Sequence, residues 1–214
     1  MRDVFIKELT ALAKIDPSIF LITGDLGFGV LENFANDFPS QFLNVGVAEQ
    51  NMTAVAAGMA LEGRKVFTYS IANFPTLRCL EQIRNDICYH DLDVTIVSIG
   101  GGFSYGQLGM SHHATEDISI LRAIPNLTVN VPSTLSEVRG AVRQIASVSK
   151  PNYLRLDKSF VDLKTIQEYV FGKATLLEEG SDITIIVAGG ILEEVLDCSK
   201  KLREQDDINC RVLS

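Results

Sequence analysis

Short apolar runs alternate with amphipathic helical segments through residues 2–157, and this alternation constrains the fold more than any other feature of the sequence. We expect strands at 20–23, 42–45, 65–70, 94–99, 127–131 and 153–156, and helices at 2–14, 31–37, 76–89, 117–123 and 135–148, with a further helix after Glu49. Strands that are joined through a helix normally run parallel to each other. The pattern therefore predicts an α/β fold with a mainly parallel sheet and helices on both faces.

The end of the chain repeats this pattern only once. After a polar stretch we expect one strand–helix–strand unit, with strands at 183–188 and 209–213 and a helix at 192–205. A lone unit of this kind cannot bury both faces of its sheet, so either the chain is cut short or something outside it completes the unit. We therefore expect a first domain at 1–158, a linker at 159–172 and an incomplete α/β domain at 173–214.

The composition excludes several classes of function. With 46% hydrophobic and 21% charged residues, the chain has the character of a globular protein. Its net charge is −8, and no basic cluster marks a surface for nucleic acid. No apolar run reaches the roughly 20 residues that a membrane helix needs, and the cysteines lack the spacing of a zinc or disulfide framework. We expect a cytoplasmic protein that binds neither nucleic acid nor a membrane.

One glutamate stands at an unusual point of this pattern. Glu49 lies where an apolar strand passes into a helix rich in alanine and glycine, with Val47, Ala48 and Met52 around it. A carboxyl group in such surroundings is either paired for structural reasons, as a helix-capping group would be, or has an altered proton affinity that is used in catalysis. The residues alone leave both explanations open.

Other polar candidates follow neighbouring strands. Asp25 follows the first strand in the segment GDLGFG, Asn73 and Phe74 follow the third, and His112 and His113 lie in a long glycine-rich loop after the fourth. Ligands of parallel sheets bind at the carboxyl edge of the strands, where these loops meet. Each candidate also has a simpler explanation: a helix cap for the aspartate, a core position for the phenylalanine and a surface position for the histidines.

Five segments in a fixed order resemble the pyrimidine-binding domain of transketolases. They are GDL at 24–26, NVGVAEQNM at 44–52, the FPTLR segment leading to EQIRND at 81–86, the pattern YGxxGxSHxxxED at 105–117, and IPNLTVNVP at 124–132. The resemblance covers about residues 1–160 and, more weakly, the start of the family's C-terminal domain from about 171. It is strongest to the separately encoded C-terminal half, the small subunit, of split transketolases.

This resemblance implies a thiamine diphosphate enzyme and gives the candidates roles on the cofactor. Glu49 would hydrogen-bond the pyrimidine N1′ atom and favour the tautomer that removes the proton at the thiazolium C2 atom. Phe74 would pack on the pyrimidine ring, and stacking needs a flat face at that point. Asp25 and Arg78 would complete the group of cofactor-binding residues.

The same resemblance implies roles on the substrate. His112 would contact substrate oxygen atoms and act in catalysis beside the glutamate, since an imidazole can donate or accept a proton near neutral pH. His113 would bind the substrate next to it. Arg2 and Lys158 would hold a sugar phosphate, the lysine as a point charge where the family more often has an arginine.

Two departures from the family pattern indicate a changed substrate. The segment GQLG stands at 106–109 where the family has GEDG, so that Leu108 replaces an aspartate. Gly100 or Gly101 stands where the family has a histidine. A site that loses two polar contacts would leave a buried substrate hydroxyl unpaired.

The sequence lacks the GDG-plus-asparagine segment with which the family binds the diphosphate and its magnesium ion. The resemblance therefore implies no metal ligand on this chain, a separate diphosphate-binding subunit, and self-association to a dimer core within a two-plus-two heterotetramer. The expected function is transfer of a two-carbon ketol unit between sugars or sugar phosphates. The alternatives are a decarboxylating relative, similar to 1-deoxyxylulose-5-phosphate synthase or the beta chain of a 2-oxoacid dehydrogenase, and a catalytically degenerate interaction module.

Overall fold

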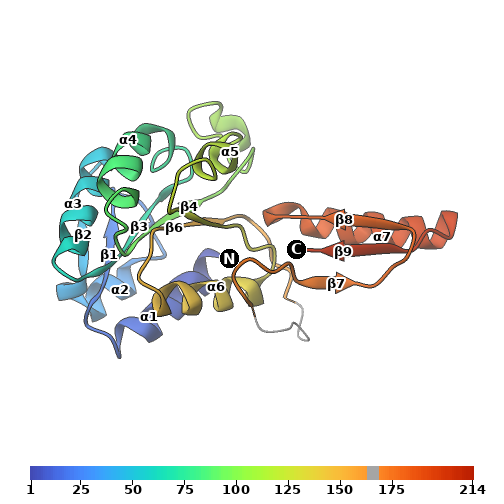
Figure 1. Ribbon diagram of the computed structural model, residues 1–214, viewed down its shortest axis with the longest axis horizontal. Helices are drawn as coiled ribbons and strands as arrows, with labels where there is room; N and C mark the ends of the chain where they lie inside the picture. Colours follow the sequence, from blue (N-terminus) through green and yellow to red (C-terminus); the bar gives the residue numbers. More distant parts are fainter. Residues whose placement is uncertain (163–168) are drawn as a thin grey trace.

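A six-stranded parallel sheet forms the centre of the larger lobe of the computed structural model, which describes residues 1–162 and 169–214 (Figure 1). Its strands are β1 (Ile19–Thr23), β2 (Phe42–Asn44), β3 (Lys65–Ile71), β4 (Val94–Ile99), β5 (Thr128–Asn130) and β6 (Asn152–Leu156). Their order is β2-β1-β3-β4-β6-β5, and each neighbouring pair is parallel. The predicted parallel α/β sheet is confirmed.

Helices cover both faces of this sheet, as the sequence predicts. One face carries α1 (Arg2–Ala13), α2 (Glu32–Asp37) and α6 (Leu135–Ser147), and the other carries α3 (Glu49–Leu61), α4 (Leu80–Gln82) and α5 (Asp117–Leu121). Because successive strand residues point to opposite faces, Leu21 joins the first apolar core and Ile22 the second. Both faces are thus buried, which explains why apolar residues of the strands point to both sides of the sheet.

The helix expected at 76–89 is divided into three pieces. A 3₁₀ turn at Leu77–Cys79 precedes α4, and a π-helical turn follows at Ile83–Cys88. The expectation of one regular helix is therefore wrong. Side-chain hydrogen bonds at the first piece compete with a regular helical pattern: the Thr76 hydroxyl donates to the Ala72 carbonyl at 2.7 Å, and Gln50 Nε2 donates to the Arg78 carbonyl at 3.0 Å. The second of these bonds fixes the backbone of Arg78 beside the start of α3.

Helix α6 begins with a buried capping box at Thr134. The Thr134 hydroxyl accepts a hydrogen bond from the Glu137 amide at 3.0 Å, and Glu137 Oε2 accepts from the amides of Thr134 at 3.1 Å and Ser133 at 2.8 Å. The N-cap is thus Thr134, whereas the neighbouring Ser133 contributes only its amide to the box. The cap orders the end of the strand-to-helix loop that also contacts the smaller lobe.

Removing this cap is expected to destabilise the protein measurably. We expect Thr134→Ala to lower the free energy of unfolding by about 1–2 kcal/mol, because a buried helix amide loses its acceptor. Thr134→Ser keeps the hydroxyl and is expected to cost much less. Urea denaturation of the two variants checks this, and equal losses in both would show that packing of the threonine methyl group, rather than the cap, is responsible.

The smaller lobe contains a three-stranded sheet and one long helix. Strands β7 (Leu176–Glu178), β9 (Cys210–Leu213) and β8 (Ile183–Ile186) lie in that order, with α7 (Leu192–Asp206) against them. The β8–α7–β9 unit is parallel as predicted, but β7 adds an antiparallel strand that the sequence analysis missed. Three residues with an irregular register carry too little alternation to be recognised.

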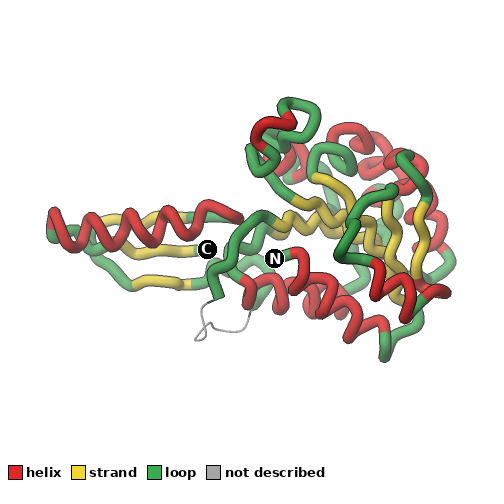
Figure 2. The backbone as a smooth tube through the Cα atoms, turned by 180° about the vertical axis from the view of Figure 1, so that it is seen from behind, coloured by secondary structure: helices red, strands yellow, loops and turns green. Residues whose placement is uncertain are grey.

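Hydrogen bonds join the two lobes beside the carboxyl end of β6. The Gly190 amide donates to Asp157 Oδ2 at 3.0 Å, and the Gly189 amide donates to the Ser133 hydroxyl at 3.0 Å. Figure 2 shows this junction from behind, with both chain ends near it. Of the linker predicted at 159–172, residues 163–168 lie outside the described part of the chain. The smaller lobe is thus anchored next to the edge where the strands of the large sheet end.

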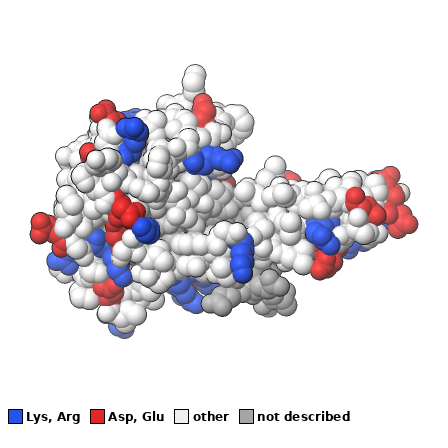
Figure 3. Space-filling view, viewed as in Figure 1, with Lys and Arg blue, Asp and Glu red and all other residues white. Residues whose placement is uncertain are grey.

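The charged side chains form no continuous basic surface on the face shown in Figure 3. Lysine and arginine are scattered over this face, and acidic side chains gather at the far tip of the smaller lobe. Within the described part of the chain, none of the helices has the length and apolar character needed to cross a membrane.

Candidate functional site

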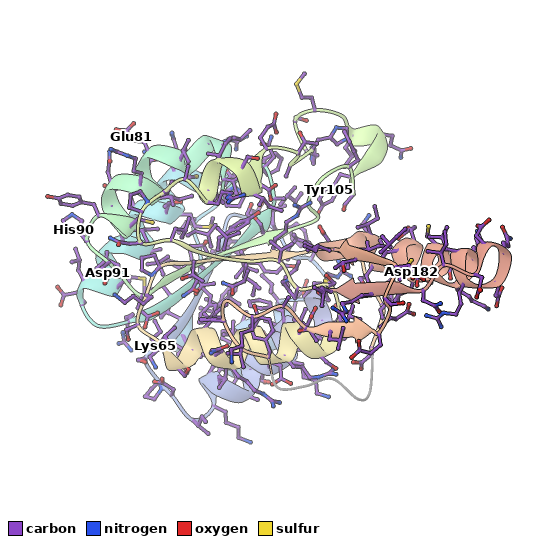
Figure 4. All side chains as sticks on the ribbon, turned by 45° about the vertical axis from the view of Figure 1, so that its right-hand side comes forward. Lys65, Glu81, His90, Asp91, Tyr105 and Asp182 are labelled. Carbon is purple, nitrogen blue, oxygen red and sulfur yellow. The ribbon has the colours of Figure 1, made fainter. Side chains whose placement is uncertain are left out.

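The parallel topology brings the predicted site residues to one edge of the sheet. Asp25 follows β1, Glu49 follows β2, Phe74 follows β3, and Lys158 follows β6. The glycine-rich loop at 100–117 follows β4 and lies over this edge, with Tyr105 on the side of the smaller lobe (Figure 4). Lys65 and Asp91 mark the opposite end of the sheet.

Glu49 is the first residue of α3, and only 2% of it is exposed. Its Oε2 atom accepts a charge-assisted hydrogen bond from Arg78 Nη1 at 2.6 Å. Gly24 leaves room beside it, because a Cβ atom there would lie 3.8 Å from Glu49 Cγ and 3.3 Å from the Gly46 carbonyl. The glutamate is therefore paired, and its carboxylate lies next to a stretch of bare backbone.

A continuous row of side chains links this carboxylate to the glycine-rich loop. The guanidinium carbon of Arg78 lies 4.9 Å from the centre of the Phe74 ring, and the Phe74 ring centre lies 5.0 Å from that of His112. Phe74 is half-buried and touches both neighbours, so it is not an ordinary core residue. The flat ring of Phe74 therefore lies between the Glu49–Arg78 ion pair and the imidazole of His112.

The two histidines have different surroundings. His112 Nδ1 is hydrogen-bonded to the Ser111 hydroxyl at 3.0 Å, and its Nε2 atom makes no hydrogen bond with the described residues. His113 Nε2 is hydrogen-bonded to the Gly106 carbonyl at 2.8 Å, and its ring packs edge-on against Phe103. His112 therefore has a ring nitrogen available for a ligand, whereas His113 makes a hydrogen bond within the loop.

Asp25 does not cap the following helix. Leu31 is the N-cap of α2, and Asp25 instead accepts a hydrogen bond from Asn44 Nδ2 at 3.0 Å while its own amide donates to Asn44 Oδ1 at 2.9 Å. The same Asn44 oxygen accepts from the Gly46 amide at 3.0 Å. Asn44, which the sequence analysis did not single out, thereby ties the loop after β1 to the turn that leads to Glu49.

The two basic candidates both lie near the loop residue Tyr105. Lys158 Nζ lies 5.4 Å from the centre of the Tyr105 ring and donates to the Ser104 carbonyl at 2.9 Å. Arg2 lines, together with Tyr105, a cavity of about 190 Å³. Arg2 also pairs with Asp3 at 3.3 Å, but both side chains are exposed and such a pair is exchanged easily.

A buried polar cluster holds both ends of the glycine-rich loop, and the sequence analysis missed it. Tyr153 Oη donates to Asp117 Oδ2 at 2.5 Å, and Arg155 lies 3.5 Å from Asp117 Oδ1 and 3.5 Å from Asp157 Oδ1. The Gly101 amide donates to Asp157 Oδ1 at 2.5 Å. Burial, reinforced by the nearby Asp117 carboxylate, raises the pKa of Tyr153 well above its ordinary value. Since these residues come from separate segments, no spacing in the sequence reveals the cluster.

Fold and site together define a parallel α/β ligand-binding domain whose acid lies at the carboxyl edge of the sheet. Residues 1–162 match the model of the family described as the transketolase pyrimidine-binding domain. The chain belongs to the transketolase family.

Individual relatives cover nearly the whole chain. It is 36% identical over 216 residues to one of the subunits of the apulose-4-phosphate transketolase of Phocaeicola vulgatus, a match that covers 99% of this chain and 69% of the relative. It is 30% identical over 214 residues to a 1-deoxy-D-xylulose-5-phosphate synthase of Clostridium perfringens, which covers 98% of this chain and 34% of that protein.

A solved structure is similar over the same extent. The structure described as "Split gene transketolase, inactive beta4 tetramer" superimposes with a TM-score of 0.87 at 35% identity, covering 99% of this chain and 69% of that one. The likeness extends past the first domain, so the smaller lobe also has its counterpart in a split transketolase. The predicted family and fold are thereby confirmed.

Proposed function

We propose that this chain is the small subunit of a split, thiamine-diphosphate-dependent transketolase that transfers a two-carbon ketol unit between sugars or sugar phosphates. The observation that carries the proposal is the buried Glu49 carboxylate at the carboxyl edge of the sheet. Glu49 pairs with Arg78, and the Arg78 guanidinium lies over the ring of Phe74. When bound, the cofactor would supply a nucleophilic carbon at its thiazolium C2 atom.

The cofactor residues on this chain fit the aminopyrimidine end of thiamine diphosphate. Glu49 would hold a proton at the pyrimidine N1′ atom, and among the described residues its second oxygen, Oε1, makes no hydrogen bond. Phe74 would offer its ring face, and the absence of a side chain at Gly24 would let the ligand approach the carboxylate. Arg78 would hold the glutamate in position until the ligand arrives, and Asp25 would order the adjoining turn through Asn44.

The substrate residues lie at the other end of the row. His112 would present its Nε2 atom to substrate oxygens, and His113 would keep the loop in the shape that places His112. Arg2 and Lys158 would attract an anionic end of the substrate. Leu108, which stands where the family has an acid, is exposed on this loop.

We propose that a separate partner chain binds the diphosphate and its magnesium ion. Within the described part of the chain, no group of three or more His, Cys, Asp or Glu side chains could hold a metal ion. Large apolar side chains around the same sheet edge are exposed, among them Phe28, Val47, Phe103 and Met110. Exposed apolar groups that surround a half-formed site are typical of a protein interface. The proposed assembly contains a dimer of this chain and two diphosphate-binding subunits.

A decarboxylating enzyme is the second candidate. The 30% identity to 1-deoxy-D-xylulose-5-phosphate synthase favours it. A degenerate interaction module is the third, and the leucine at position 108 supports it. A buried, paired Glu49, linked through Arg78 and Phe74 to a His112 with an available ring nitrogen, supports an enzyme instead.

Reconstitution separates these candidates. The chain is mixed with a diphosphate-binding subunit from the same source, thiamine diphosphate and magnesium, and is assayed with D-xylulose 5-phosphate, D-fructose 6-phosphate and pyruvate. We expect ketol transfer from a ketose phosphate to an aldehyde acceptor. Release of carbon dioxide from pyruvate without ketol transfer would favour the decarboxylating enzyme, and a stable complex that binds no cofactor would favour the interaction module.

A further inference from the structure

The space above the two glycines that follow β4 is filled by other side chains. A Cβ atom at Gly100 would lie 2.5 Å from Tyr105 Cε2, and one at Gly101 would lie 1.5 Å from Arg155 Nε. The Arg155 guanidinium is engaged with two buried carboxylates, whereas Tyr105 is half-buried and lines the cavity that it shares with Arg2. A side chain at position 100 and the present place of Tyr105 therefore exclude each other.

Tyr105 is surrounded by the residues expected to meet the substrate. The Lys158 ammonium lies 5.4 Å from its ring centre, the His112 ring lies 5.8 Å away, and Arg2 shares its cavity. Among the described residues nothing hydrogen-bonds the Tyr105 hydroxyl. A phenol that has two cations in its surroundings and no hydrogen-bond partner among the described residues is suited to an anionic ligand.

The cavity is small and mixed in character. Its volume of about 190 Å³ is bounded by Arg2, Tyr69, Ser70 and Tyr105 and by apolar residues, among them Leu26 and Ile99. Pockets for whole small ligands usually measure about 300–1,000 Å³, so this cavity accommodates one end of a ligand. Helix α1 begins at Arg2, which brings the positive end of a 12-residue helix to the same place.

We propose that Tyr105 is a specificity-determining residue, whose hydroxyl donates a hydrogen bond to a tetrahedral oxyanion, a phosphate or a sulfonate, at one end of the substrate. The identity of that substrate as a sugar rests on the proposed function, whereas binding of the oxyanion is a property of this chain alone. Gly100 and Gly101 have no polar side chain to offer the substrate, and in this proposal the Tyr105 hydroxyl provides that polar group.

The ionisation of the phenol agrees with a donor role. Burial raises the pKa of Tyr105, and the nearby Arg2 guanidinium opposes this with a smaller effect. The phenol therefore keeps its proton at neutral pH and can donate it to an oxyanion. An ionised tyrosine at this position would repel the same ligand.

The test titrates the full chain with inorganic phosphate in one arm and with methanesulfonate in a second arm, at constant ionic strength. Chemical shifts of the backbone amides in the loop at 100–117 report binding. We expect Tyr105→Phe, which keeps the ring and removes only the hydroxyl, to weaken binding of the preferred anion about tenfold or more. The arm with the tighter binding identifies the head group.

Tyr89→Phe is the matched control. Tyr89 is 80% exposed and its ring packs against His90, which lies far from Tyr105 (Figure 4), so the Tyr89 hydroxyl should not affect the titration. Arg2→Met is expected to weaken anion binding as well. Equal affinities of the wild-type protein and Tyr105→Phe, or no binding of either anion by the wild-type protein, would overturn the inference.

The outcome is separable from that of the proposed function. Anion binding that depends on Tyr105, together with failure of every reconstituted assay, would count against the proposed function alone. Ketol transfer by the reconstituted enzyme, together with unchanged anion affinity in Tyr105→Phe, would count against the role of Tyr105 alone. In the reconstituted enzyme the same variant should raise KM for a phosphorylated or sulfonated ketose and change kcat little.

Discussion

Replacing Glu49 by glutamine is expected to lower kcat of the reconstituted enzyme by about 100- to 10,000-fold, the usual range for loss of a proton-transferring group. The amide has the same shape as the carboxylate but cannot hold a proton for a ring nitrogen. The fold should survive the change, because Arg78, which loses its partner, is 47% exposed and can be hydrated. Steady-state kinetics and the urea midpoint of the same preparation measure the two effects.

Glu62→Gln provides the control for that experiment. Glu62 is exposed and adjoins the other end of α3, so the same chemical change occurs far from the sheet edge. We expect its kcat to remain at the wild-type value. Normal turnover in Glu49→Gln would show that the glutamate has no role in proton transfer and serves only to pair with Arg78.

The second large effect is expected on stability, from the cluster that holds the glycine-rich loop. Asp117→Ala should lower the free energy of unfolding by about 3–5 kcal/mol, because it leaves the buried Tyr153 hydroxyl without its acceptor and removes one of the two carboxylates that pair with Arg155. Asp117→Asn keeps an oxygen for the tyrosine and should cost less. Urea denaturation measures both.

The neighbouring acid serves as the control for this cluster. Glu116 is exposed and its carboxylate accepts a hydrogen bond from the Thr115 hydroxyl, so Glu116→Ala should change stability little. A loss below about 1 kcal/mol in Asp117→Ala would show that water enters the cluster and replaces the carboxylate. The loop would then be held by the Gly101 amide and its contact with Asp157.

The large sheet was predicted well because each of its strands is marked by a short run of apolar residues that are adjacent in the sequence. The apolar run of β4, for example, ends at a loop rich in glycine, and the parallel order follows from the helices between the strands. The division of the helix at 76–89 could not be predicted, since it depends on Gln50 reaching the Arg78 carbonyl from another helix. The proposed linker at 159–172 stays a prediction.

The sequence predicted those site residues that belong to a recognisable motif. It missed the features that arise from contacts between separate segments. Glu49 and His112 stand in recognisable motifs, and the structure brings them to one edge. The pairing of Glu49 with Arg78 and the place of Tyr105 over Gly100 depend on how the segments after β2, β3 and β4 fold and meet, which no spacing records. Roles on the cofactor came from the resemblance and remain proposals.

The most direct test of a shared cofactor site is the affinity for thiamine diphosphate, measured by calorimetry with magnesium present. This chain alone, the diphosphate-binding partner alone and an equimolar mixture of the two are titrated in parallel, and the mixture is repeated with Glu49→Gln. We expect tight binding only in the wild-type mixture, with a clear loss of affinity in the variant mixture. Equal binding by the partner alone and by the mixture, or equal affinity with glutamine at position 49, would contradict a site that this chain completes.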